Sequence, residues 1–388
     1  MFLIEKAFAG SRRYWAWLGV LAVFMFVALL DWIHEQQVGL AITGLSRDVP
    51  WGLYIGQFVF FVGVGASALV VVLPCYLHDW KAYAKITILG EILGMVGVFM
   101  AMVFIFVSMG QPTRLLNVLL YPHPNSLIFW DLLTLSGYVA LNAVIIVRLL
   151  ISERTLSAPP RWIKALILLS LPWAVAIHTV TAFLLCGLAA RPYWMTALLA
   201  PRFLASAFTA GSALMVLILL LLKRLRLFDA GDEAVRKLTI TAAYCLVVHL
   251  FFTLVEMFTT FYGRVPQEVE HVDYLYGGSP LSPWMWLSAV LAVAALLVLI
   301  VPAWRARHLL LACVAAFISI WIDKGFGLVI GGFEPSVLGT VTPYVPTFAE
   351  WKLVAGIWAM GAFLITVLYK IVLSETPFRV SLIEDCNE

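Results

Sequence analysis

Ten apolar runs dominate this sequence, and each is about as long as the hydrocarbon core of a bilayer is thick. A helix that crosses this core needs about 20 mostly apolar residues. Hydrophobic residues make up 63% of the chain and charged residues 12%, against about 45–50% and about 25% in soluble domains. We therefore predict an all-α polytopic membrane protein and exclude a soluble globule, a disordered chain, a nucleic-acid-binding protein and a disulfide-stapled secreted fold. The predicted spans are residues 14–33, 51–77, 86–109, 128–150, 163–189, 203–222, 238–262, 283–303, 308–330 and 350–373.

The basic residues predict the orientation of these spans. An even number of spans places both termini on one side, and 18 of the 25 Lys and Arg residues belong to segments of that side. By the positive-inside rule, both termini are expected to be cytoplasmic and the protein to lie in the inner membrane. The first run follows Arg12 and Arg13 like a signal peptide, but it is too long and has no small-residue cleavage site, so we interpret it as a retained span.

Cysteine and histidine positions argue against a resident metal cofactor. The five cysteines lie far apart without a C-x-x-C pair, which excludes a cysteine-ligated iron–sulfur cluster or zinc site within this chain. Haem b would require two histidines facing each other inside the membrane, and only His178 and His249 lie well inside predicted spans. We expect no haem, no iron–sulfur cluster and no metal site here.

Hydrogen-bonding and titratable residues gather in the outer half of the first five spans. The most informative are Asp131, in the first turns of the fourth span, and His178, about 22 Å from the inner face. Such a group suits a quinol, whose two oxygens need hydrogen-bond partners and whose oxidation releases two protons that a His and a carboxylate can take. The candidate quinone-binding residues are Gln37, Trp51, Tyr54, Gln57, Arg114, Asp131 and His178, and Asp131 and His178 are the candidate catalytic residues.

Structural interpretations of these residues stay open. Asp131 could simply favour a helix N-terminus, and His178 could be a packed histidine bonded to a backbone carbonyl. Arg114 fits an interfacial anchor better than a ligand, while Gln37 and Gln57 carry little weight individually.

A second set of ionisable residues lies in the seventh, ninth and tenth spans. We expect a structural ion-pair network there, because unpaired charges inside a membrane are costly, and a proton route is the alternative. Glu91, in the inner half of the third span, could extend a proton path towards the cytoplasm or pair with Lys85. The members of this second set are His249, Glu256, Asp323, Lys324 and Glu350.

Several motifs, taken in order, resemble the NrfD/polysulfide-reductase membrane-subunit family in its ten-helix branch. The resemblance covers nearly the whole chain, and it is strongest to the membrane subunit of the sulfite-reductase-associated Dsr complex, with Hme, Qrc and hydrogenase-2 membrane subunits as close alternatives. The motifs are Val49-Pro50-Trp51-Gly52-Leu53-Tyr54, Gly110-Gln111-Pro112-Thr113-Arg114, Phe129-Trp130-Asp131, Ile177-His178-Thr179-Val180-Thr181, Ala190-Arg191-Pro192-Tyr193-Trp194, Trp321-Ile322-Asp323-Lys324-Gly325 and Tyr344-Val345-Pro346-Thr347.

This resemblance implies a cofactor-less subunit built as one membrane domain. It implies a first span and outer loop (1–50), two four-helix bundles (51–190 and 191–330), and a last loop, span and tail (331–388). It further implies a menaquinone site in the first bundle near the outer face, with quinone-site character at Tyr54, Asp131 and His178. Where many members have Asp-Leu-Gly-Arg-Pro, this chain has Ser108-Met109-Gly110-Gln111-Pro112, so no role carries over to Ser108 and Gln111.

The implied partners are an extracytoplasmic, ferredoxin-like iron–sulfur subunit, a multihaem cytochrome c, a haem b membrane subunit and a cytoplasmic iron–sulfur subunit. We therefore predict a menaquinone-reactive membrane subunit of a redox complex, not active alone. The alternatives are a proton-coupled secondary transporter and a membrane scaffold without quinone chemistry.

Overall fold

The computed structural model describes residues 6–77, 80–83, 86–155, 160–336 and 338–373, and Lys85 lies outside them. It confirms the predicted fold class, because these residues form helices and loops without a β-strand and include ten helical stretches long and apolar enough to cross a membrane. The long helices are α2 (Arg12–Val38), α3 (Leu53–Ala66) with α4 (Leu69–Leu77), α5 (Thr87–Ser108), α7 (Leu127–Thr155), α8 (Arg161–Cys186), α9 (Leu199–Arg224), α10 (Asp232–Gly263), α12 (Ser282–Ile300), α13 (Pro302–Ile322) with the π-helix η5 (Asp323–Ile330), and α14 (Phe348–Leu373).

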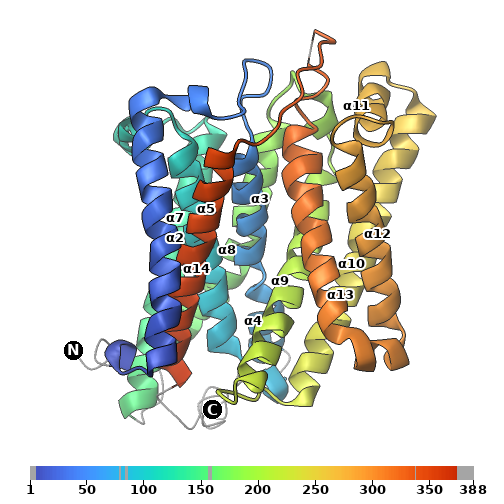
Figure 1. The fold of residues 1–388 in the computed structure, drawn as a ribbon. Helices are drawn as coiled ribbons and strands as arrows, with labels where there is room; N and C mark the ends of the chain where they lie inside the picture. The colour runs from blue at the N-terminus through green and yellow to red at the C-terminus, as the bar shows by residue number, and fades with distance from the viewer. Residues whose placement is uncertain (1–5, 78–79, 84–85, 156–159, 337, 374–388) are drawn as a thin grey trace.

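The long helices stand side by side, as Figure 1 shows. In an N-terminal group, α3 packs against α5 and α8, and α7 packs against both of these helices. In a C-terminal group, α9 packs against α10 and α13, and α12 packs against both of these. α3 and α9 join the two groups, while α2 and α14 pair with each other along the outside. The division of the chain into four functional segments stays a prediction.

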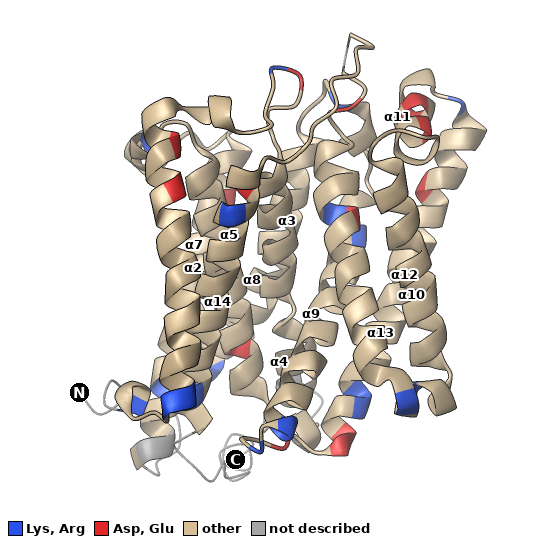
Figure 2. Cartoon of the chain, in the orientation of Figure 1, with Lys and Arg blue, Asp and Glu red and all other residues tan. Residues whose placement is uncertain are grey.

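The two ends of the helix array differ in structure and charge. One end, here called the loop end, carries α11 (Pro266–Tyr276) and the loops 39–52 and 331–347. At the opposite end α2 begins and α14 finishes, and many of the Lys and Arg positions coloured in Figure 2 lie there. The predicted orientation in the membrane depends on this distribution of basic residues. The orientation itself stays a prediction.

The second span is interrupted between α3 and α4, at Ser67 and Ala68. The interruption leaves the Gly65 carbonyl oxygen free of a regular helical bond, and the Tyr138 hydroxyl of α7 donates to it at 3.0 Å. The Ser67 hydroxyl donates back to the Val64 carbonyl oxygen. Side chains therefore replace backbone hydrogen bonds at a break inside the membrane, as they must where water is excluded.

Close backbone approach joins α3 to η5. A Cβ atom added to Gly56 would lie 3.0 Å from the Gly325 Cα atom and 3.2 Å from the Gly325 carbonyl oxygen. We predict that Gly56→Ala lowers the free energy of unfolding by about 1–3 kcal/mol, since overpacking a tight contact forces the backbone apart. Unfolding in detergent measures this change. Gly19→Ala on α2 is the matched control, since no atom lies within 4 Å of its added Cβ; equal effects of the two variants would contradict the prediction.

Candidate functional site

Two carboxylate–phenol pairs lie near the loop end, and sequence reasoning missed one of the two acids. The Tyr54 hydroxyl on α3 donates to Glu35 Oε2 on α2 at 3.1 Å. Both side chains are buried. Glu35 Oε1 has no hydrogen-bond partner within the part of the chain that the structure describes. The prediction overlooked Glu35 because it ended the first span at residue 33, whereas α2 continues to Val38.

Glu350 belongs to the second pair and lies apart from the other members of its predicted set. Its Oε1 accepts a hydrogen bond of 2.5 Å from the Tyr344 hydroxyl. Its Oε2 accepts from the backbone N–H groups of Gly44 and Thr347, both at 2.8 Å. The Tyr344 hydroxyl in turn accepts from the Leu53 N–H at 2.8 Å. This acid therefore anchors two loops to the first turn of α14.

Asp131 is buried where α7 packs on α8. Its Oδ1 accepts a hydrogen bond of 2.7 Å from the Thr181 hydroxyl. Thr181 lies three residues after His178 on α8, so the two side chains share one face of that helix, about 4.5 Å apart along its axis. The structure therefore brings the two candidate catalytic residues to the same part of the N-terminal group.

His178 is fully buried and faces a lysine. The Lys324 Nζ atom of η5 lies 3.5 Å from His178 Nε2. His178 Nδ1 has no hydrogen-bond partner among the described residues. Lys324, placed with the second set by its sequence position, instead faces the N-terminal group.

Arg202, which lies one residue before the predicted sixth span, is central to the second set. Arg202 of α9 pairs with Glu256 of α10 and donates to Asp323 Oδ1 of η5 at 2.8 Å. His249 Nε2 lies 3.7 Å from Asp323 Oδ2. The structure therefore joins His249, Glu256 and Asp323 through Arg202. The predicted sixth span began at residue 203, whereas α9 begins at Leu199, which places Arg202 inside the helix.

The remaining quinone-site candidates have different surroundings. Gln57 is buried, and its Oε1 accepts from the indole N–H groups of Trp321 and Trp358, both at 3.0 Å. Trp51 stacks on Trp194 with ring centroids 5.8 Å apart. Gln37 and Arg114 are exposed, so the structure does not bring them to the Asp131–His178 region.

Glu91 is buried in the half of the protein away from the loop end. Neither of its carboxylate oxygens has a hydrogen-bond partner among the described residues.

The loop 331–347 is tied to α11, a helix that the sequence did not predict. The Tyr274 hydroxyl bonds to the Glu334 carboxylate, which also accepts from the Tyr344 N–H at 3.0 Å. His271 Nδ1 lies 2.8 Å from the Glu334 carbonyl oxygen. Burial raises the pKa of Glu334 and lowers the pKa of His271, because burial penalises the charged form of each group. This network holds the loop beside Tyr344 and Glu350.

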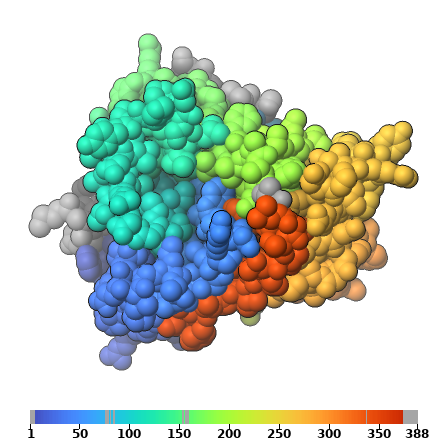
Figure 3. All heavy atoms as spheres, turned by 90° about the horizontal axis from the view of Figure 1, so that it is seen from above, coloured from blue at the N-terminus to red at the C-terminus, as the bar shows by residue number. Residues whose placement is uncertain are grey.

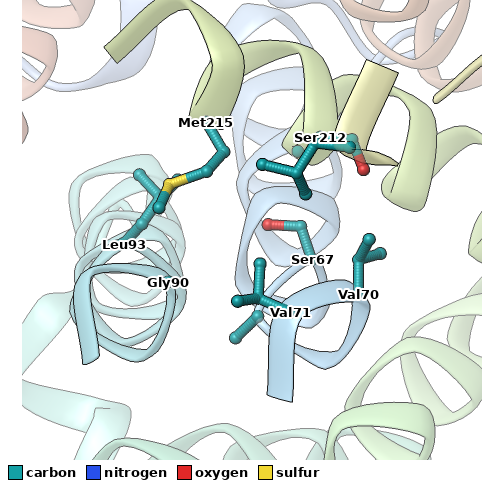
Figure 4. A pocket seen from close by; sticks show the side chains of 10 residues that line it. Ser67, Val70, Val71, Gly90, Leu93, Ser212 and Met215 are labelled. Carbon is teal, nitrogen blue, oxygen red and sulfur yellow. The ribbon is translucent and has the colours of Figure 1, made fainter. Parts of the chain in front are cut away.

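A narrow crevice without room for a water molecule lies at the α3–α4 break (Figure 4). Its lining comes from α4, α5, α9 and α10 and is mostly apolar, with two hydroxyl groups from Ser67 and Ser212. None of the candidate quinone residues lines this crevice. Over the described ranges, no group of three or more His, Cys, Asp and Glu side chains is placed to hold a metal ion.

The model of the protein family described as "Polysulphide reductase, NrfD" matches residues 41–333, which is most of this chain. The chain belongs to the NrfD family. This match includes α3 to α13 and therefore Tyr54, Asp131 and His178. The predicted family is thus confirmed, whereas its Dsr branch stays a prediction.

Three similar proteins match this NrfD-family chain over almost its whole length. A protein of Halobacterium salinarum, named as a candidate membrane subunit of a dimethyl sulfoxide reductase, is 26% identical over 90% of this chain and 89% of its own. The Hdr-like menaquinol oxidoreductase integral membrane subunit of Archaeoglobus fulgidus is 22% identical over 95% of each chain. A selenate reductase subunit of Mesobacillus selenatarsenatis is 21% identical over 93% of this chain and 94% of its own. The chain is therefore a membrane subunit of the kind found in such oxidoreductase complexes.

Proposed function

We propose that this NrfD-family subunit binds menaquinol or menaquinone in the N-terminal helix group and exchanges its electrons with an iron–sulfur subunit at the loop end. One observation carries the proposal: Asp131, a buried carboxylate of α7, accepts a hydrogen bond from Thr181, which lies three residues after His178 on α8, and His178 is a buried imidazole with an unpartnered ring nitrogen among the described residues. A carboxylate can accept the proton of a quinol hydroxyl, and an imidazole can hydrogen-bond to a quinone oxygen.

Another candidate residue, Tyr54 of α3, supports this assignment. Tyr54 already donates its hydroxyl proton to Glu35, so its phenol oxygen is left to accept a hydrogen bond from a ligand. The tyrosine therefore holds the headgroup as an acceptor in this proposal. The name of the Archaeoglobus fulgidus relative contains "menaquinol oxidoreductase", which favours menaquinol as the substrate.

The loop end is the proposed docking side. Figure 3 views the protein from this end. The segment after α5 exposes a run of apolar side chains there, including Leu120 at 67% and Tyr121 at 77% exposure. Large exposed apolar patches are typical of interaction surfaces, which supports a second subunit at this end. The basic residues at the opposite end support an extracytoplasmic position for the loop end.

A transporter fits the helix interruptions less well. Alternating-access transporters usually have broken helices in corresponding positions of two halves. Among the described helices, the interruptions are the α3–α4 break in the second span, and a kink at His308 and the π-helix η5 in the ninth. The second span opens its four-helix group and the ninth closes the other, so these positions do not correspond.

Titration of the purified protein with a fluorescent quinol-site inhibitor tests the proposal. We expect saturable quenching that a menaquinone analogue competes away, and we expect the protein to purify from its host with iron–sulfur and cytochrome subunits. A folded protein that shows no saturable, competable quenching would overturn quinone binding. Purification without redox partners would instead favour the transporter.

A further inference from the structure

Three acceptors surround the amino group of Lys324. Nζ lies 3.4 Å from the Phe203 carbonyl oxygen, 4.7 Å from the centroid of the Phe203 ring and 3.5 Å from His178 Nε2. A protonated lysine carries three N–H donors and no acceptor. The carbonyl oxygen and the ring face both attract N–H hydrogens. His178 Nε2 is the remaining group within 3.5 Å, and it can take the third hydrogen when it carries no proton of its own.

Packing holds this arrangement in place. Lys324 is 1% exposed and His178 0% exposed. Gly63 of α3 makes room for the amino group, because an added Cβ atom there would lie 3.0 Å from Nζ. The His178 ring also meets the Phe203 ring edge to face, with centroids 6.1 Å apart. Residues of α3, α8, α9 and η5 thus fix the lysine and the histidine relative to each other.

We propose that Lys324 is a positioning residue that keeps His178 in the tautomer with its proton on Nδ1. A nitrogen that accepts a hydrogen bond from Nζ cannot carry the proton of a neutral imidazole, so the proton must be on the other ring nitrogen. That nitrogen, Nδ1, has no hydrogen-bond partner in the described ranges. His178 therefore presents a single, unused N–H donor.

This arrangement specifies how the site binds its ligand, and this step rests on the proposed function. A buried N–H donor is rarely left unpaired, and a quinone carbonyl oxygen supplies the missing acceptor. Because Nδ1 already carries a proton, His178 cannot take another proton there from a quinol hydroxyl. One quinol proton instead goes to the Asp131 carboxylate, and the second leaves through the same carboxylate after Asp131 has released the first towards the loop end, while the two electrons pass to the iron–sulfur partner of the proposed function. The two residues thus have opposite roles: His178 donates a hydrogen bond and Asp131 accepts a proton.

Nitrogen NMR of protein labelled with ¹⁵N-histidine tests the tautomer directly. The protein contains seven histidines, and the difference between wild-type and His178→Ala spectra assigns the His178 signals. In ligand-free wild-type protein we expect protonated Nδ1 and unprotonated Nε2. In Lys324→Met, which keeps the length but loses the donors, we expect the proton to move to Nε2 in a large fraction of molecules. Lys324→Gln, which keeps an N–H donor, should restore the wild-type pattern in part.

The outcomes separate this inference from the proposed function. A wild-type His178 protonated at Nε2 overturns the tautomer assignment without any variant. An unchanged tautomer in folded Lys324→Met overturns the role of the lysine. If the tautomer is as expected, inhibitor titration should show about tenfold weaker binding in Lys324→Met, a loss of one hydrogen bond. Absence of binding in the wild type would contradict the quinone site while leaving the tautomer assignment intact.

Discussion

Replacing Asp131 with asparagine is expected to lower menaquinol oxidation by the assembled complex by about 100-fold or more. The amide keeps the size of the side chain and can still accept the Thr181 hydrogen bond, but it cannot take the proton that the quinol hydroxyl releases. The rate of quinol-dependent reduction of the iron–sulfur partner measures the loss. The inhibitor should still bind, because the shape of the site is preserved.

Two further variants define the cause of this loss. Asp273→Asn changes an exposed carboxylate on α11 and should leave the rate unchanged. Thr181→Val removes the hydrogen bond to Asp131 but leaves the acid, so a smaller loss than in Asp131→Asn is expected. Full activity of Asp131→Asn in an intact complex would remove this residue from the mechanism.

Replacing Arg202 with methionine is expected to destabilise the protein by about 3–5 kcal/mol. Arg202 pairs with both Glu256 and Asp323, and these side chains are 19% and 11% exposed. Without the arginine, two carboxylates remain close together in a poorly hydrated site without their cation. Unfolding in detergent, monitored by loss of helical signal, measures the change in free energy.

The matched control for Arg202→Met is a triple variant in which all three charged side chains of the Arg202 cluster become neutral. Adding Glu256→Gln and Asp323→Asn to Arg202→Met removes the stranded charges, so much of the lost stability should return. Lys223→Met breaks an exposed pair with Asp232 and should have little effect. A stability of Arg202→Met equal to the wild type would show that water or another cation reaches the two acids.

Apolar length and charge distribution were sufficient to predict the ten spans, because bilayer thickness limits helix length directly. The partners of the buried polar residues could not be predicted in this way. Arg202 and Glu35 lie within a few residues of predicted span ends, so small boundary errors moved them out of the membrane. Lys324 and Asp323 are neighbours in sequence, but Lys324 lies beside His178 of α8 whereas Asp323 pairs with Arg202 of α9, and only the packing of η5 determines that.

The candidate site shows the same limit. Sequence reasoning selected Asp131 and His178, and in the structure Asp131 accepts a hydrogen bond from Thr181, three residues after His178 on α8. Arg114 and Gln37 were grouped with them by depth alone, yet depth does not specify which way a side chain points. The Gln57 side chain accepts hydrogen bonds from two indole groups. These tryptophans lie about 260 and 300 positions further along the chain, and no local sequence pattern indicates such contacts.

The pairing of α2 with α14 has a consequence for biosynthesis. About 310 residues separate the end of α2 from the start of α14, so at typical translation rates the ribosome needs roughly 15–60 s to deliver the second helix after the first. During that interval Asp31 of α2 lies in the membrane without Lys352, its ion-pair partner at 2.6 Å. A nascent chain that stalls before α14 would therefore retain Asp31 without its ion-pair partner, so this acid is paired only after the last span has been made.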